Sequence, residues 1–459
     1  MIAPLGCAVL FSSTLAQSPN NPSSALQMAP EGSFLTSDLN TTQSFAGIDL
    51  MASTPALFGP TKKQVQYNFF EPRPNAIPWG QVNGLLPDPF SALFSPVRNL
   101  EVASQEQIGT RWDIYNVTVY QASTSSMAGN SDAEGVNRFN LRADVKLWDF
   151  GGGAVGRVTA QMRQTNAFPK SSDLGTQVGT DITLDSNFTG HLGTRLARLR
   201  YEQGFLDNHV VFSIGKINPN DYLLNNPFAG DETTQFLASI FDGSDATLSG
   251  FQGYLLGTAL LVVPCEGVYA NFVATAPSTQ ATNGLGADLL DTGLWWFGSE
   301  VGIVTDFLGD KGAPGRYSVG FNTTNASYGS TDIATASSGN GFWLMATEYF
   351  TADIGAWAQF TYSDPDVALY KSEFTAGISI DHCFGRKRDG FGAAFGYTTN
   401  PQGDLGVQTV TEIYYRLQLT ESVQLTPDIQ IITNPTNPVA DTSDGGTIVV
   451  FGLRALVHF

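Results

Sequence analysis

The sequence predicts an all-β protein: a transmembrane antiparallel up-and-down β-barrel of about 16 strands, preceded by an irregular N-terminal leader. Three observations lead to this fold. Charged and apolar residues alternate along many strand-length runs, turn residues separate these runs, and the run 446–459 ends the chain on Phe459. Because successive strand side chains point to opposite faces, each such run has one wet face and one apolar face.

Composition narrows the class of protein further. The 459 residues include 42 acidic and 23 basic side chains, a formal net charge of −19, which makes nucleic acid an unfavourable partner. Hydrophobic residues make up 42% but are scattered. The longest apolar stretch, 254–263, is shorter than the roughly 18 residues that a membrane-spanning helix needs. A membrane crossing must therefore use strands.

Two N-terminal segments precede the expected barrel. Residues 1–17 are similar to a secretory signal peptide, with a short apolar core and small residues near 14–16. Residues 18–105 are rich in Pro, Ser and Asn, and proline disrupts both helices and strand ladders. Aromatic residues in this leader indicate that it docks at the barrel mouth or in the lumen, although a flexible linker would explain the same composition. The barrel is expected to occupy 106–459.

Strand-like runs recur from about residue 108 onward, between clusters of Gly, Asn, Asp, Ser and Pro that are typical of turns. We count about sixteen, and an even number suits a bacterial barrel with both termini on the periplasmic side. The runs begin near Arg111, Arg138, Gly153, Arg195, Asn208, Leu255, Gly267, Gly293, Gly315, Gly341, Gly355, Glu373, Gly390, Val407, Ser422 and Gly446.

Alternation also predicts which side chains line the lumen. A charge on the lipid face at mid-depth costs about 2–4 kcal/mol, so the charged face of each run must point inward. One-sided soluble sheets alternate as well, but they seldom carry so many charges on so many strands. The residues that share the charged faces are Arg142, Asp144, Lys146, Trp148, Arg157, Arg163, Arg198, Arg200, Glu202, Glu412, Tyr414 and Arg416.

Three parts of the chain carry family-like motifs. They are Asp144–Gln164 (DVKLWDFGGGAVGRVTAQMRQ), Trp296–Gly320, and a C-terminal region with EIYY at 412–415, LTPDIQ at 425–430 and the final GLRALVHF. These motifs resemble the carbohydrate-selective porins of the OprB family, over about residues 110–459. The leader and the stretches 165–192 and 275–292 depart from the pattern. The resemblance implies a sixteen-stranded outer-membrane channel that passes sugars by passive diffusion.

The segment 218–245 follows a predicted strand and is too long for a tight turn. Loops of this length usually carry function or are disordered, and the aromatic residues of this one argue against disorder. We expect it to fold into the lumen as a constriction. An extracellular loop packed over the rim is the alternative. The expected constriction residues are Asp221, Tyr222, Asp231, Glu232 and Phe236.

Charge is unevenly placed along the barrel. Residues 138–200 contain nine Lys or Arg and five Asp or Glu, whereas residues 251–382 contain three and thirteen. Consecutive strands are neighbours in an up-and-down barrel, so these blocks should form opposing walls and a transverse field that favours solutes with many hydroxyl dipoles. The alternative places half of the acidic residues on solvated loops. The acidic residues expected in the lumen are Glu300, Asp381 and Glu348.

Aromatic side chains are candidates for sugar contact, because a sugar ring needs an apolar face beside polar groups. In porins, however, aromatic residues most often form the interfacial girdles, so the two interpretations compete at each position. The candidates are Trp148, Trp296, Trp343 and Tyr414, of which Trp148 and Tyr414 share faces with charged residues.

The sequence offers no catalytic, cofactor or metal site. The four histidines lie far apart without the spacing of metal ligands, and no nucleophile motif is present. We expect a porin of the bacterial outer membrane whose partners are the lipid bilayer and small hydrophilic solutes, above all sugars. A general or ion-selective porin, an outer-membrane hydrolase and a structural barrel remain alternatives. A homotrimer is compatible with this fold, although barrel closure does not require one.

Overall fold

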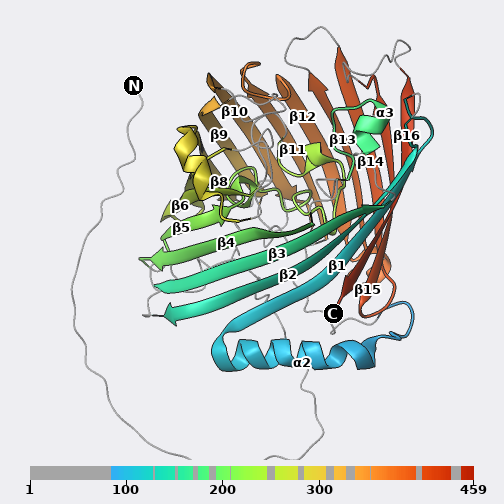
Figure 1. Cartoon of the computed structure of the whole chain (residues 1–459), viewed down its shortest axis with the longest axis horizontal. Helices are drawn as coiled ribbons and strands as arrows, with labels where there is room; N and C mark the ends of the chain where they lie inside the picture. The colour runs from blue at the N-terminus through green and yellow to red at the C-terminus, as the bar shows by residue number, and fades with distance from the viewer. Residues whose placement is uncertain are drawn as a thin grey trace, which may run out of the picture. The chain divides into compact units, whose positions relative to one another are not determined.

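The sixteen described strands form one closed antiparallel barrel in the computed structural model (Figure 1). The structure describes residues 84–127, 130–149, 154–168, 174–185, 193–206, 208–244, 254–277, 284–305, 315–326, 336–351, 353–399, 406–435 and 446–459. Each strand pairs with its sequence neighbours, and β1 closes the ring against β16. The predicted fold class and strand number are confirmed.

The strands begin close to the predicted starting positions. The largest differences are at β2 and β10, which begin before the predicted positions. The strands are β1 (Thr110–Ser123), β2 (Ala133–Asp149), β3 (Val155–Phe168), β4 (Gly193–Phe205), β5 (Val210–Ile217), β6 (Leu255–Cys265), β7 (Val268–Thr275), β8 (Trp296–Thr305), β9 (Gly315–Ala326), β10 (Ala336–Tyr349), β11 (Ile354–Ser363), β12 (Ser372–Asp381), β13 (Gly390–Thr399), β14 (Val407–Gln418), β15 (Val423–Thr433) and β16 (Thr447–His458).

Helical segments lie between or before the strands. They are α2 (Ser91–Ile108), α3 (Leu174–Val178), and the short 3-10 turns η1 (Pro219–Asp221), η2 (Ser239–Phe241), η3 (Ala287–Thr292) and η4 (Cys383–Gly385). Among the described residues, no helix is both long enough and apolar enough to cross a membrane. The signal-like segment 1–17 and the leader up to residue 83 lie outside the described residues.

The closing strand β16 shows how alternation sorts the side chains. Phe451 and Leu453 face outward with 54% and 47% of their surface exposed, whereas Arg454 faces the interior with 1% exposed. A lipid-facing wall of this kind can hold only apolar side chains without a large cost, and the guanidinium between them must turn inward. The β16 pattern predicted from sequence is therefore confirmed.

The two ends of the barrel differ in the length of their connections. Short turns join β6 to β7 and β14 to β15 at one end, and long connections such as 218–254 lie at the other. In outer-membrane barrels the short turns are periplasmic and the long loops extracellular. Phe459 follows β16 at the short-turn end, where Figure 1 also shows α2.

Helix α2 was not predicted, because its proline-rich sequence is typical of irregular structure. Pro96 lies within the helix and cannot donate to the carbonyl of Ala92, but the hydroxyl of Ser95 donates to that oxygen at 3.3 Å. Part of the predicted leader is thus helical.

Contacts with the β14–β15 turn and with Phe459 fix this helix at the periplasmic end. Arg98 donates to Glu421 at 2.8 Å in the turn between β14 and β15. The Phe94 ring packs edge-on against Phe459, with centroids 4.9 Å apart. These contacts hold α2 beside the β14–β15 turn, and the docking expected for the leader as a whole stays a prediction.

The interior of the barrel is partly filled by protein. Tyr222, Leu223 and Leu224 of the 218–244 segment are buried in a cluster with inward residues of β5 to β10. A second cluster combines α3 and the rest of that segment with inward residues of β11 to β16. The lumen therefore contains apolar packing as well as the expected charged lining.

We predict that a charge on the outer wall destabilises the barrel according to its depth. Leu453→Arg, at the middle of β16, should lower the free energy of unfolding by about 2–4 kcal/mol, whereas Thr447→Arg, at the extracellular end, should cost about 0–1 kcal/mol. Urea unfolding in lipid bilayers measures both values. Equal effects at the two positions would contradict the assigned lipid face.

Candidate functional site: an inward loop held by arginines and carboxylates

The segment 218–244, here called the inward loop, turns into the barrel directly after β5. Asn218 caps the turn η1, where its side chain accepts a hydrogen bond from the main-chain N–H of Asn220 at 3.2 Å. Pro219 occupies the first position of η1, where its fixed φ favours the turn and its missing N–H costs nothing. This local geometry delivers Asp221 to the strands that carry the arginine residues.

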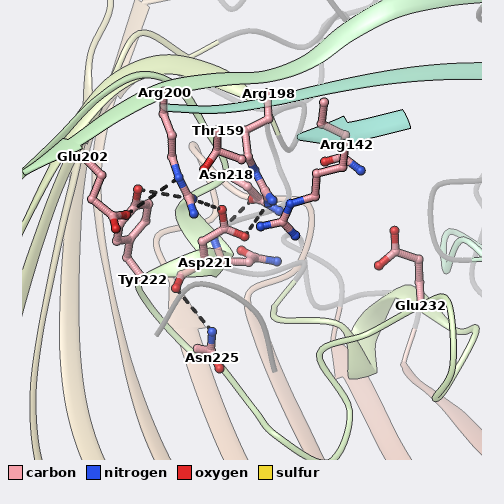
Figure 2. Close-up of polar contacts among 12 residues, drawn as sticks. Arg142, Thr159, Arg198, Arg200, Glu202, Asn218, Asp221, Tyr222, Asn225 and Glu232 are labelled. Carbon is pink, nitrogen blue, oxygen red and sulfur yellow. Dashed lines mark hydrogen bonds and ion pairs between the residues drawn. The ribbon is translucent and has the colours of Figure 1, made fainter. Parts of the chain in front are cut away.

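Asp221 forms the first anchor of the inward loop. Its two carboxylate oxygens accept hydrogen bonds from Arg198 and Arg200 of β4, each at 2.8 Å. Figure 2 shows the guanidinium groups of Arg142, Arg198 and Arg200 converging on this carboxylate. All three ion-paired side chains are buried, and breaking a buried pair by removing one partner typically costs about 3–5 kcal/mol.

Further carboxylates balance the same arginine residues. Arg142 of β2 lies 3.1 Å from Asp144, which also accepts a hydrogen bond from the Thr159 hydroxyl at 2.6 Å. Arg200 lies 3.9 Å from Glu202 on its own strand. In this arrangement each guanidinium has a carboxylate within ion-pairing distance, so the group is held in place without a large net charge.

Glu232 forms a second anchor farther along the inward loop. Its Oε1 lies 3.1 Å from Arg138 and 3.4 Å from Arg163, and its main-chain oxygen accepts from Arg454 at 2.8 Å. Burial alone would raise the pKa of Glu232, but the Arg163 and Arg138 guanidinium groups hold it below its ordinary value. The Tyr254 ring faces Arg163, with its centroid 4.8 Å from Cζ.

Carboxylates of β8 and β14, on the far wall of the barrel from β2 to β4, bind the loop through its main chain. Glu300 of β8 accepts from the Leu224 N–H at 3.0 Å and from the Trp343 indole at 2.8 Å. Glu412 of β14 accepts from the N–H groups of Leu237 and Ala238 at 2.6 and 2.8 Å. These carboxylates satisfy donors that would otherwise be buried without partners.

Arg416 and Asp381 lie on the same side of the barrel, and Arg416 also contacts the loop. Arg416 of β14 pairs with Asp381 at 2.9 Å and donates to the Thr234 carbonyl at 3.3 Å. Asp231 accepts from the N–H of Thr233 at 3.0 Å, which stiffens the tip of the loop. The inward loop is thus bound on both sides of the barrel.

Aromatic packing completes the hold on the loop. The Phe236 ring meets Tyr414 edge-on at 4.9 Å and Trp357 at 5.3 Å, and Phe241 at 5.2 Å. Phe228 lies beside Trp357 at 6.4 Å. Such pairs contribute about 0.5–1.5 kcal/mol each beyond burial, so this half of the loop is a packed element rather than a solvated one.

The structure brings most of the predicted site residues together around the inward loop. The expected loop residues lie inside the barrel, and the register places the residues predicted to line the lumen on the lumenal face, except Trp148 and Glu348. Arg157 faces the lumen opposite Glu202 in the β3–β4 register. Whether these residues set the permeation properties stays a prediction.

Trp148 lies on the outer wall, so its predicted lumenal position is wrong. A bulge between Lys146 and Trp148 shifts the β2–β3 register by one residue and turns the indole outward, where it packs near Tyr201 with ring centroids 5.7 Å apart. This position belongs to the interfacial girdle. Lys146 keeps its predicted face but sits exposed at the periplasmic rim, 2.7 Å from Asp149.

Glu348 also departs from its expected lumenal position. It pairs in register with Ala356, on the outward face of β10 and β11 near the periplasmic end, and it accepts a hydrogen bond from the outward Tyr317 hydroxyl. Trp296 and Trp343 do face inward, but they are 2% and 0% exposed beneath the inward loop. They cannot touch a solute in this conformation.

Sequence reasoning missed several inward cations. Arg138 binds Glu232 but was not named as a site residue. Arg195 was missed because it lies three positions from Arg198, which on a regular strand means opposite faces. A register shift opposite Met162 brings Arg195 and Arg198 onto the lumenal face. No residue type in this stretch predicts the shift.

The fold and the inward loop define a class of protein. A closed sixteen-stranded barrel with an apolar outer wall, a charged lumen and one long loop folded inside is a porin of the bacterial outer membrane. The sequence model of the carbohydrate-selective porin, OprB family matches residues 132–459, and the chain belongs to this family. It therefore forms an outer-membrane channel for carbohydrates and other small hydrophilic solutes.

One solved structure shows the same fold, and two further ones are also similar to this chain. The high-pH structure of Pseudomonas putida OprB is 13% identical, with 79% of this chain and 97% of that chain covered and a TM-score of 0.65. Its low-pH structure is 12% identical, covering 82% and 99%, with a TM-score of 0.47. A triple mutant of the Rhodopseudomonas blastica porin is 13% identical, covering 76% and 100%, with a TM-score of 0.47. No curated protein matches.

We predict that Asp221→Asn loosens the first anchor and shifts the channel toward anions. The neutral amide leaves Arg198 and Arg200 without their shared counter-ion, which should lower the free energy of unfolding by about 3–5 kcal/mol. The reversal potential across a KCl gradient in planar bilayers measures the selectivity. Asp366→Asn, on an exposed extracellular connection, is the matched control and should leave both quantities unchanged.

Proposed function

We propose that the inward loop is the constriction of the channel and that the buried Arg142, Arg198 and Arg200 side chains hold it in place. The shared ion pair between Asp221 and two arginine residues carries this proposal, because it fixes donors and acceptors inside the barrel. A sugar loses hydration when it enters a narrow passage, and charged groups that remain partly exposed there, such as Glu232 with 16% of its side chain exposed, offer hydrogen bonds to its hydroxyls in exchange.

The proposal assigns transport, not a chemical reaction, to this chain. Within the described residues, no group of three or more His, Cys, Asp or Glu side chains could hold a metal ion. The buried carboxylates Glu300 and Glu412 bind main-chain N–H groups of the loop, which suits a structural role. Uptake of radiolabelled or osmotically active sugars into proteoliposomes tests transport directly.

We predict that detaching the loop from β14 widens the passage. Glu412→Ala removes the acceptor of the Leu237 and Ala238 N–H groups, and each hydrogen bond is worth about 0.5–1.5 kcal/mol. Single-channel conductance should rise, and sucrose should enter liposomes faster relative to glucose. Glu412→Gln, which keeps one acceptor oxygen, should lie between the variant and the parent. Unchanged conductance and sugar ratio in Glu412→Ala would place the constriction elsewhere.

The outer wall of β1 to β3 suggests how copies of the barrel assemble. On β1, the outward residues Asn116 and Thr118 lie midway between the outward aromatics Trp112 and Tyr120, and hence in the apolar band between the girdles. The side chain of Asn137 on β2 donates to both, at 2.6 and 2.8 Å.

Two more amides extend this patch onto β3. Asn166 pairs in register with Asn137, and Gln164 pairs with the outward Phe139. Hydrocarbon offers such groups no hydrogen bonds, whereas the same patch on a second barrel offers both donors and acceptors. We propose that this wall contacts further copies of the chain in a homotrimer. The amide donors and acceptors of one copy would bind those of another.

We predict that Asn137→Leu weakens this assembly. Loss of the central amide should shift the population from trimer to monomer in native mass spectrometry of detergent-solubilised protein, while single-channel opening of the monomer persists. Thr411→Leu, on the outward face of β14 away from the patch, is the control. A parent protein that is monomeric in both detergent and bilayer would contradict the proposed assembly.

A further inference from the structure

The lumenal arginine residues of β2 to β4 fall into two groups that differ in their counter-charges. The first group is matched in number by carboxylates within ion-pairing distance: Arg142, Arg198 and Arg200 with Asp144, Asp221 and Glu202. The second group consists of Arg138, Arg163 and Arg195, and is here called the extracellular arginine group because its members lie toward the extracellular ends of their strands.

Glu232 is shared within the extracellular arginine group. Arg138 and Arg163 both approach its Oε1, at 3.1 and 3.4 Å. Within the described part of the chain, Arg195 forms no ion pair. It stands directly opposite Arg163 in the β3–β4 register, so the two arginine residues are neighbours on the lumenal face. Of these two, Arg163 alone pairs with Glu232 among the described residues.

This juxtaposition is costly unless an anion completes it. Like charges directly opposite on neighbouring strands destabilise a sheet, and here both side chains are 8% exposed, where screening by water is weak. The buried Nε atoms of Arg163 and Arg195 have no hydrogen-bond partner among the described residues. The face of Tyr254 restrains the Arg163 guanidinium from one side, so the group cannot simply swing away.

We infer that the extracellular arginine group binds the anionic group of a sugar phosphate or sugar acid entering from outside. The inference rests on the proposed function, since it names a solute class for the same channel. A phosphate or carboxylate placed between Arg163 and Arg195 accepts hydrogen bonds from both forks, the geometry for which guanidinium groups are suited. The chain's net charge of −19 disfavours anions in general, so this local cationic group would give selectivity among them.

Arg195 is the critical residue of the proposed site, because among the described residues it is the member of the group that has no carboxylate as an ion-pair partner. Planar-bilayer recordings with glucose 6-phosphate, gluconate and glucose as probes test it. In the parent, both anionic sugars should reduce the ion current at concentrations at least about tenfold below that of glucose, as expected for one charge-assisted contact. Inorganic phosphate should compete with both.

Arg195→Gln should abolish this difference and raise the half-blocking concentration of glucose 6-phosphate about tenfold, with no change for glucose. Arg316→Gln removes one cation from the lumenal face of β9, opposite Thr347, and is the charge-matched control. Equal block of the parent channel by anionic and neutral sugars overturns the inference. So does an Arg195→Gln channel that anionic sugars block as strongly as the parent. An Arg316→Gln channel whose block by anionic sugars falls as much as that of Arg195→Gln also overturns it.

Glucose entry into liposomes separates the two levels of the argument. If glucose enters but anionic sugars show no preferential block, the anion site fails and the sugar channel stands. If glucose does not enter, the proposed function fails first. Heat-modifiable migration in gels shows in each case that the variant barrel is folded.

Discussion

Every other feature of this protein depends on the backbone hydrogen bonds between β1 and β16. In hydrocarbon an unpaired N–H or C=O costs several kcal/mol, so a sheet can cross a membrane only as a ring without edges. The register from Tyr115–His458 to Ser123–Val450 makes that closure. Once the ring is closed, its strands cannot rotate, and alternate side chains are committed either to lipid or to the lumen. The positions of the buried arginine residues follow from that commitment.

The closed ring is too wide to be filled by its own side chains, and the inward loop supplies the missing interior. On one side it meets arginine residues through Asp221 and Glu232, and on the other it packs Phe236 among aromatic rings. The loop's anchoring carboxylates therefore pair with one side of the barrel, and its aromatic rings pack against the other. An asymmetric interior of this kind leaves polar groups available on the arginine side, where solute recognition has been placed.

Alternation with period two predicted the barrel, its strand number and the lumenal face of Arg142, Arg200 and Arg454. It did so because the cost of placing a charged side chain in lipid is the largest local energy term. It failed where the period itself breaks. The bulge after Lys146 moved Trp148 outward, and the shift opposite Met162 moved Arg195 inward. Contacts such as Glu412 with the inward loop join residues about 175 positions apart, and a single sequence carries no signal for them.

The way in which Glu300 and Glu412 grip the inward loop bears on how this channel can diverge. Both carboxylates bind main-chain N–H groups of Leu224, Leu237 and Ala238, which every amino acid except proline possesses. Substitutions of loop side chains other than the anchors Asp221 and Glu232 can therefore alter the chemistry presented to a solute while the loop keeps its path. Selection for new nutrients can therefore change the side chains of the inward loop without changing the strands of the barrel.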